Sequence, residues 1–179
     1  MKKKVVRELL EMFDKPLKWV LVSEQGPLWD VRWETPNDEY QFMTQKEPIE
    51  YETIIKNYLD GQGIKLDPST DVWSVAFATQ SLGWIATGHQ ESLSIFSTVF
   101  DILKSWVIKY NPPIILLAAK TEEQSRMRLY DSFCRKVDDE FQYLYLGSSD
   151  KVTALQGLDE SHRYYWLIRK DIYKNKTEE

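Results

Sequence analysis

The spacing of apolar residues along the second half of the chain predicts two helices separated by a strand. In residues 92–110 apolar side chains recur every three or four positions, which is typical of a helix with one buried face. Residues 122–137 repeat this pattern, with Met127, Tyr130 and Phe133 on the inward face. Residues 114–118 between them form a continuous aliphatic run, as in a strand that is buried on both faces.

Strand patterns surround these helices. Apolar and small residues alternate in residues 72–79, and a short turn predicts a partner strand at residues 82–86. Two aromatic segments, residues 141–146 and 164–169, are separated by a polar loop and predict a closing antiparallel hairpin.

The first 70 residues contain the same kinds of pattern in shorter pieces. Their spacing predicts a helix at residues 3–13, three strands, and a helix at residues 47–59. The three strands are expected at residues 17–23, 28–34 and 40–44, separated by turns that contain glycine or proline. No linker divides the chain, so we expect residues 1–179 to form one domain, with an N-terminal part at residues 1–70.

The order of these elements predicts the fold class. A helix between two strands with short connections is the βαβ crossover, which favours parallel pairing around residues 114–118. We therefore expect a mixed α/β fold, in which helices flank a mixed sheet with a central βαβ crossover. The predicted core residues lie on the two helices and the strand between them: Phe96, Phe100, Leu103, Leu116, Leu129 and Phe133.

Charge and composition exclude several classes of function. The net charge is −5 and the basic residues are scattered, so the sequence argues against nucleic-acid binding. The longest apolar run is too short to span a membrane and no secretory signal is present, so we expect a cytoplasmic protein. With Cys134 as its single cysteine, the chain forms no internal disulfide and no cysteine-based zinc site.

One motif resembles a known family. Residues 125–133 read Ser-Arg-Met-Arg-Leu-Tyr-Asp-Ser-Phe and follow the predicted strand at 114–118. This arrangement resembles the GNAT acyltransferase superfamily, whose A-x-x-L-Y-x-x-x-G-F helix follows its fifth strand, and the resemblance covers about residues 71–170. The pairs Thr87-Gly88 and Leu129-Tyr130 also resemble a group of phage-encoded GNAT-like proteins. The resemblance implies that Tyr130 would be the acid that reprotonates the thiolate of coenzyme A, and that the protein acts in a host cytoplasm or a virion.

The turn that would bind the cofactor departs from the family pattern. In GNAT enzymes a glycine-rich turn before a helix presents backbone N–H groups to the pyrophosphate of acyl-CoA. The matching residues would be Gly88, His89 and Gln90, but Gly88 is the only glycine in this turn. The carboxylate of Glu91 also favours the helix N-terminus, so it would compete with a phosphate.

Two functions are therefore open. The leading interpretation is a GNAT-like domain with a degenerate cofactor turn, which binds no cofactor and acts as a binding or structural protein with a protein partner. The alternative is an acyl-CoA-dependent N-acyltransferase that uses Tyr130 as its acid, with His89 or Glu91 near acetyl-CoA or another acyl-CoA. His162 is expected in a solvated loop without a metal-binding partner.

Overall fold

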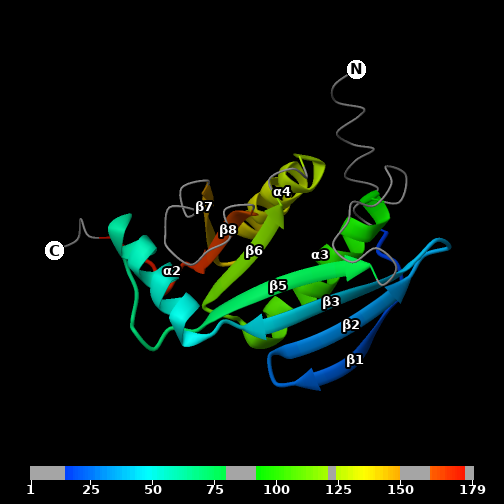
Figure 1. Ribbon diagram of the computed structural model, residues 1–179, viewed down its shortest axis with the longest axis horizontal. Coiled ribbons are helices and arrows are strands. Elements are labelled where there is room, and N and C mark those ends of the chain that lie inside the picture. The colour runs from blue at the N-terminus through cyan, green and yellow to red at the C-terminus, as the bar shows by residue number, and fades with distance from the viewer. Residues whose placement is uncertain (1–14, 80–91, 121–123, 150–161, 176–179) are drawn as a thin grey trace. The chain divides into compact units, whose positions relative to one another are not determined.

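The computed structural model describes residues 15–79, 92–120, 124–149 and 162–175 (Figure 1). Their elements follow the order β1 (Trp19–Gln25), β2 (Leu28–Glu34), β3 (Glu39–Lys46), α2 (Ile49–Gly61), β4 (Ile64–Lys65), β5 (Val72–Thr79), α3 (Ser92–Tyr110), β6 (Ile114–Lys120), α4 (Gln124–Glu140), β7 (Tyr143–Ser149), β8 (His162–Arg169) and β9 (Lys174–Asn175). Contacts group the chain into two compact units. The first contains Met1–Thr44 and Ala76–Asn111, and the second contains Gln45–Val75 and Pro112–Glu179.

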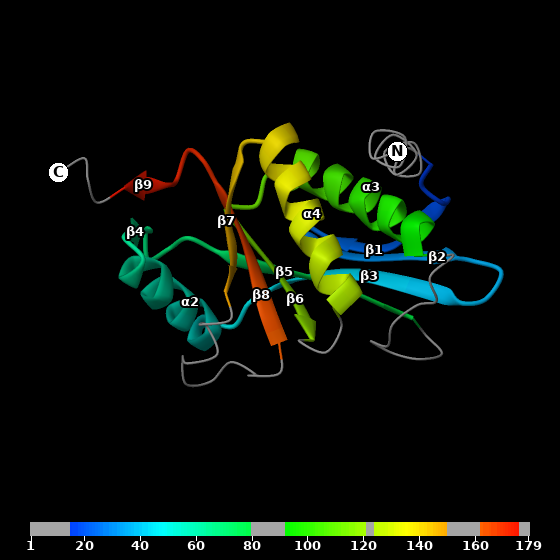
Figure 2. The same cartoon turned by 90° about the horizontal axis from the view of Figure 1, so that it is seen from above.

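The first unit contains the antiparallel strands β1, β2 and β3, with α3 over one face (Figures 1 and 2). Alternate residues of β2 are buried, namely Trp29, Val31 and Trp33, as the period of two requires for a sheet with one covered face. The indole N–H of Trp19 donates to Asp101 of α3 at 2.8 Å, which ties the first strand to the helix.

The carbonyl group of Pro27, in the turn between β1 and β2, accepts hydrogen bonds from two other elements of this unit. The Pro27 oxygen accepts a hydrogen bond from the Trp106 indole of α3 at 2.8 Å and another from the Thr44 hydroxyl of β3 at 2.6 Å. Thr44 in turn accepts from the backbone N–H of Trp29 at 2.8 Å. Gly26 has a φ of 59°, a value that glycine adopts without strain, so it lets the chain reverse and present Pro27.

A carboxylate at the end of β1 receives donors from two elements. Glu24 accepts hydrogen bonds from the Lys109 ammonium at 2.6 Å, from the Tyr110 hydroxyl and from the Trp29 indole at 3.0 Å. The Lys109 ammonium also lies 6.0 Å from the centre of the Trp29 ring, within the range of a cation–π contact. The donors, Lys109 first, lower the pKa of Glu24 from 4.5 to about 2.

The second unit is built on the strand order β5-β6-β8-β7. Strand β6 pairs in parallel with β5, from Val72 opposite Ile114 to Val75 opposite Leu117, and antiparallel with β8 along its whole length. Strand β7 pairs antiparallel with β8. The parallel pair is connected through α3, which is the βαβ crossover expected from the sequence.

Helices α2 and α4 lie on opposite sides of β6 and β8 (Figure 2). One apolar cluster joins α2 to the strands that it covers. Its members are Ile55 and Leu59 of α2, Ile64 of β4, Val72 of β5, Ile114 and Leu116 of β6, and Tyr164, Trp166 and Ile168 of β8. The intervening residues Ile115, Leu117, Tyr165 and Leu167 are also buried and point to the side of α4. A short ladder between β4 and β9 lies beside this arrangement.

The observed elements confirm the mixed α/β fold class and most predicted segments. Helix α3 and strand β2 have the predicted bounds, and Phe96, Phe100, Leu103, Leu116 and Phe133 are buried. The parallel partner of β6 is β5. The predicted strand at residues 82–86 and the predicted helix at residues 3–13 lie outside the described residues, as does the Leu129 side chain. The prediction that His162 lies in the polar loop is wrong, because His162 begins strand β8 and pairs with Lys120. The single-domain assignment stays a prediction.

We expect Leu103→Ala to lower the free energy of unfolding by about 2–5 kcal/mol, because it removes a fully buried side chain and leaves a cavity. Leu103 is 1% exposed. Ile108→Ala on the same helix is the control, since Ile108 is 66% exposed and its truncation should change the free energy by less than about 0.5 kcal/mol. Equal effects of the two substitutions in urea denaturation would contradict the orientation of α3.

The Glu24 contacts predict a dependence of stability on acid. Because the folded pKa lies below the unfolded one, Glu24 contributes its full stabilisation above pH 4.5 and loses it as the pH falls through about 2. The difference in unfolding free energy between the wild type and Glu24→Gln should therefore shrink steadily over that interval. Denaturation curves at several pH values measure it, with Glu34→Gln at the exposed end of β2 as the control. A difference that does not vary with pH would show that the charge of Glu24 has no role.

Candidate functional site

Tyr130 lies on the buried face of α4. Apolar residues at Met127, Tyr130 and Cys134 follow the helical repeat, so they share the side of the helix that packs on β8. Tyr130 is 4% exposed, and its ring meets that of Tyr165 edge to face, with 5.6 Å between their centres. This geometry is the preferred one for paired aromatic rings in a core. The structure therefore places the predicted acid at a packing position.

Tyr165 of β8 reaches the backbone of α4 beside Tyr130. Its hydroxyl donates to the Met127 carbonyl oxygen at 3.0 Å, in a buried setting. Burial raises the pKa of Tyr165 to about 12, although the positive charge of Arg163 works in the opposite direction. The hydroxyl therefore stays protonated at neutral pH, and its hydrogen bond holds the strand against the helix.

A more exposed polar network is built on Asp131, the residue that follows Tyr130 on α4. The Tyr145 hydroxyl donates to one oxygen of Asp131 at 2.6 Å, and Arg135 donates to the other oxygen at 3.0 Å. Burial alone would raise the pKa of Asp131, but the hydrogen bonds from Tyr145 and Arg135 and the positive charges nearby hold it below its usual value. Burial is also the main cause of the raised pKa of Tyr145. The Asp131 carboxylate is thus kept charged, and Tyr145 is kept neutral.

The remaining candidates for chemistry divide into three cases. Cys134 is fully buried and burial raises the pKa of its thiol, so it packs as an apolar side chain and supplies no thiolate. Gly88, His89 and Gln90, the predicted cofactor contacts, lie outside the described residues, as does Glu91. Within the part of the chain that the structure describes, no three metal-binding side chains gather, and no helix has the length and apolar character needed to cross a membrane.

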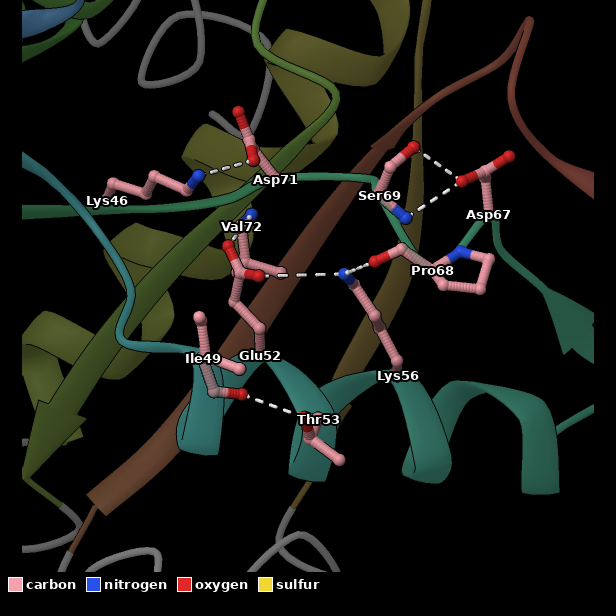
Figure 3. Close-up of polar contacts among 10 residues, drawn as sticks. All are labelled: Lys46, Ile49, Glu52, Thr53, Lys56, Asp67, Pro68, Ser69, Asp71 and Val72. Carbon is pink, nitrogen blue, oxygen red and sulfur yellow. Dashed lines mark hydrogen bonds and ion pairs between the residues drawn. The ribbon is translucent and has the colours of Figure 1, made fainter.

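The structure also shows a hollow that the sequence analysis did not find. It has a volume of about 400 Å³ and lies between α2 and the segment that contains Lys65, Leu66 and Pro68. Glu52 and Lys56 of α2 line it, and Figure 3 shows them reaching towards each other and towards Val72 and Pro68. Their i, i+4 spacing was a possible signal. That spacing is common on exposed helix faces, and nothing in the sequence shows that Glu52 is buried.

We expect Tyr145→Phe to raise the pKa of Asp131, because the substitution removes a hydrogen bond that favours the charged carboxylate. Tyr143→Phe is a matched control, since the Tyr143 hydroxyl donates instead to the Pro112 carbonyl oxygen at 2.5 Å. An NMR titration of the Asp131 carboxyl carbon measures both variants. An unchanged titration in Tyr145→Phe would show that the hydrogen bond from Tyr145 does not contribute to the lowered pKa of Asp131.

No protein-family model matches the chain, and no curated protein matches its sequence. Among solved structures, the chain is similar to a mutant of the spermidine N-acetyltransferase SpeG from Vibrio cholerae. The two chains are 10% identical and have a TM-score of 0.38, and the match covers 83% of this chain and 70% of that one. Similarity at this level does not assign the chain to a family.

Proposed function

We propose that this protein is a GNAT-like binding protein that does not transfer acyl groups. Its fold would serve as a scaffold, and its surface would bind another protein. The proposal places it in the cytoplasm, or in a host cytoplasm or virion if the resemblance to phage-encoded proteins holds.

The burial of Tyr130 is the observation that carries this proposal. A general acid must come within hydrogen-bond distance of the atom that it protonates. At 4% exposure, with its ring edge to face on Tyr165, Tyr130 has the surroundings of a packing residue. A tyrosine on the buried face of α4, between Met127 and Cys134, has a sufficient structural reason to be there.

The sequence of the segment before α3 supports the same conclusion. An anion site at a helix N-terminus needs a backbone that phosphate oxygens can approach and a positive potential that nothing else occupies. With Gly88 as its only glycine and Glu91 one residue before the helix, the segment meets neither requirement well.

Exposed apolar side chains on β1 support a role in protein binding. Val20 and Val22 are 59% and 54% exposed on the same short strand. A contiguous exposed patch of apolar side chains is a feature of surfaces that bind other proteins, and these two valines would form part of such a patch.

The alternative function is an acyl-CoA-dependent N-acyltransferase. It is favoured by the order of strand, helix, strand and tyrosine-bearing helix from β5 to α4 of this chain. In that case the protein must bind acyl-CoA, which the binding-protein proposal does not require. Ligand binding therefore separates the two functions directly.

We expect acetyl-CoA to leave the melting temperature of the purified protein unchanged. A ligand at a hundredfold excess over its dissociation constant would add about 2.7 kcal/mol of stability, which scanning fluorimetry detects readily. ADP serves as the control for unspecific nucleotide binding. The wild type and Tyr130→Phe should both release free coenzyme A only at the background rate, measured with a panel of primary amines as acceptors. A stabilisation by acetyl-CoA together with acyl transfer that Tyr130→Phe slows would replace this proposal with the enzyme.

A further inference from the structure

The hollow beside α2 contains a buried carboxylate with unused hydrogen-bonding capacity. Glu52 is 7% exposed, and its Oε1 atom accepts a hydrogen bond from the Val72 backbone N–H at 3.1 Å. Its Oε2 atom lies 3.6 Å from the Lys56 ammonium, which is an ion-pair distance but too long for a hydrogen bond (Figure 3). Within the described chain, Oε2 accepts no hydrogen bond. The atom opens onto the hollow and is reached by water, so a ligand hydroxyl that enters the hollow can replace that water as its donor.

Lys56 places hydrogen-bond donors beside this acceptor. Its ammonium donates one hydrogen bond, to the Pro68 carbonyl oxygen at 2.6 Å (Figure 3). An ammonium carries three protons, and the contact with Glu52 is long. A group that donates to Glu52 and accepts from Lys56 at the same time would add a hydrogen bond to each of the two side chains.

The polar groups that line the hollow form a row along the helix. Glu52, Lys56 and Asp60 follow one another at intervals of four residues, which corresponds to about 6 Å per step along a helix. Acceptor, donor and acceptor therefore alternate over about 12 Å. Asn57, which is exposed, adds an amide that can both donate and accept.

The charge of the lining indicates an uncharged ligand. The hollow has two acidic residues, Glu52 and Asp60, and two basic ones, Lys56 and Lys65, so it carries no net charge to attract an ion. Leu66 and Pro68 provide an apolar wall on the side opposite to the helix. A ligand that fits must combine hydroxyl-like groups with a C–H surface.

We propose that this hollow binds a neutral polyhydroxy compound of about the size of a monosaccharide. One hydroxyl donates to Glu52 Oε2 and accepts from Lys56 Nζ, a second contacts the Asn57 amide, and the C–H face packs on Leu66 and Pro68. This binding is independent of acyl transfer, because none of these residues belongs to the Tyr130 neighbourhood.

The test is an amide NMR titration of the full chain with three probes of similar size. D-glucose is neutral, gluconate is an anion and glucosamine is a cation. We expect glucose to shift the amides of residues 53–57 and 65–66 along a saturable curve, and the two charged probes to bind at least about tenfold more weakly.

Two variants localise the site without removing the buried pair. Asn57→Leu fills the rim and removes an amide at an exposed position, so it should abolish the saturable shifts while the protein stays folded. Gln142→Leu makes a comparable change at an exposed position before β7 and should leave glucose binding unchanged. Saturable shifts that persist in Asn57→Leu, equal binding of all three probes, or shifts spread without saturation over the surface would each overturn the proposal.

Discussion

Strands β6 and β8 carry large apolar side chains on both faces, and the second unit follows from this constraint. A strand of this kind cannot leave either face in water, so each face needs a cover. Leu116 and Trp166 meet α2 on one side, while Leu117 and Tyr165 point to the side of α4. The helices are therefore required by the strands between them, and the same alternation decides which helix residues become core.

This two-sided burial also determines where polar groups remain available. On the α4 side, Tyr165 uses its hydroxyl on a backbone carbonyl, so the polar end of the ring is satisfied within the core. On the α2 side, Glu52 points to the first residue of β5 and satisfies one backbone N–H, but among the described residues only one of its two oxygens has a hydrogen-bond donor. Packing has thus satisfied the hydroxyl of Tyr165 inside the core, and it leaves Glu52 Oε2 open to the hollow beside α2.

The elements could be predicted from the sequence wherever periodicity was strong. Helix α3 has its apolar residues on one face and ends at Tyr110. The next residue, Asn111, adopts a left-handed φ of 45° directly before two prolines. The strands β4 and β9 were missed because two-residue ladders leave no periodic pattern. Tyr130 could be found from its motif, but its exposure depends on Tyr165, which lies 35 residues further along the chain. The hollow could not be predicted, because it depends on a contact between α2 and a segment without any distinctive sequence.

The carbonyl of Pro27 has a consequence for anyone who wishes to modify this protein. A tight turn between two antiparallel strands would ordinarily be chosen to receive an epitope, a fluorophore-binding tag or new chain termini, because such sites usually tolerate insertion. Here the carbonyl oxygen that follows Gly26 joins the indole of Trp106 and the hydroxyl of Thr44. An insertion would separate three parts of the chain at once and leave a buried tryptophan N–H without its acceptor. The turn between β2 and β3 has mainly local hydrogen bonds between Thr35 and Asp38, and it offers the safer position for a graft.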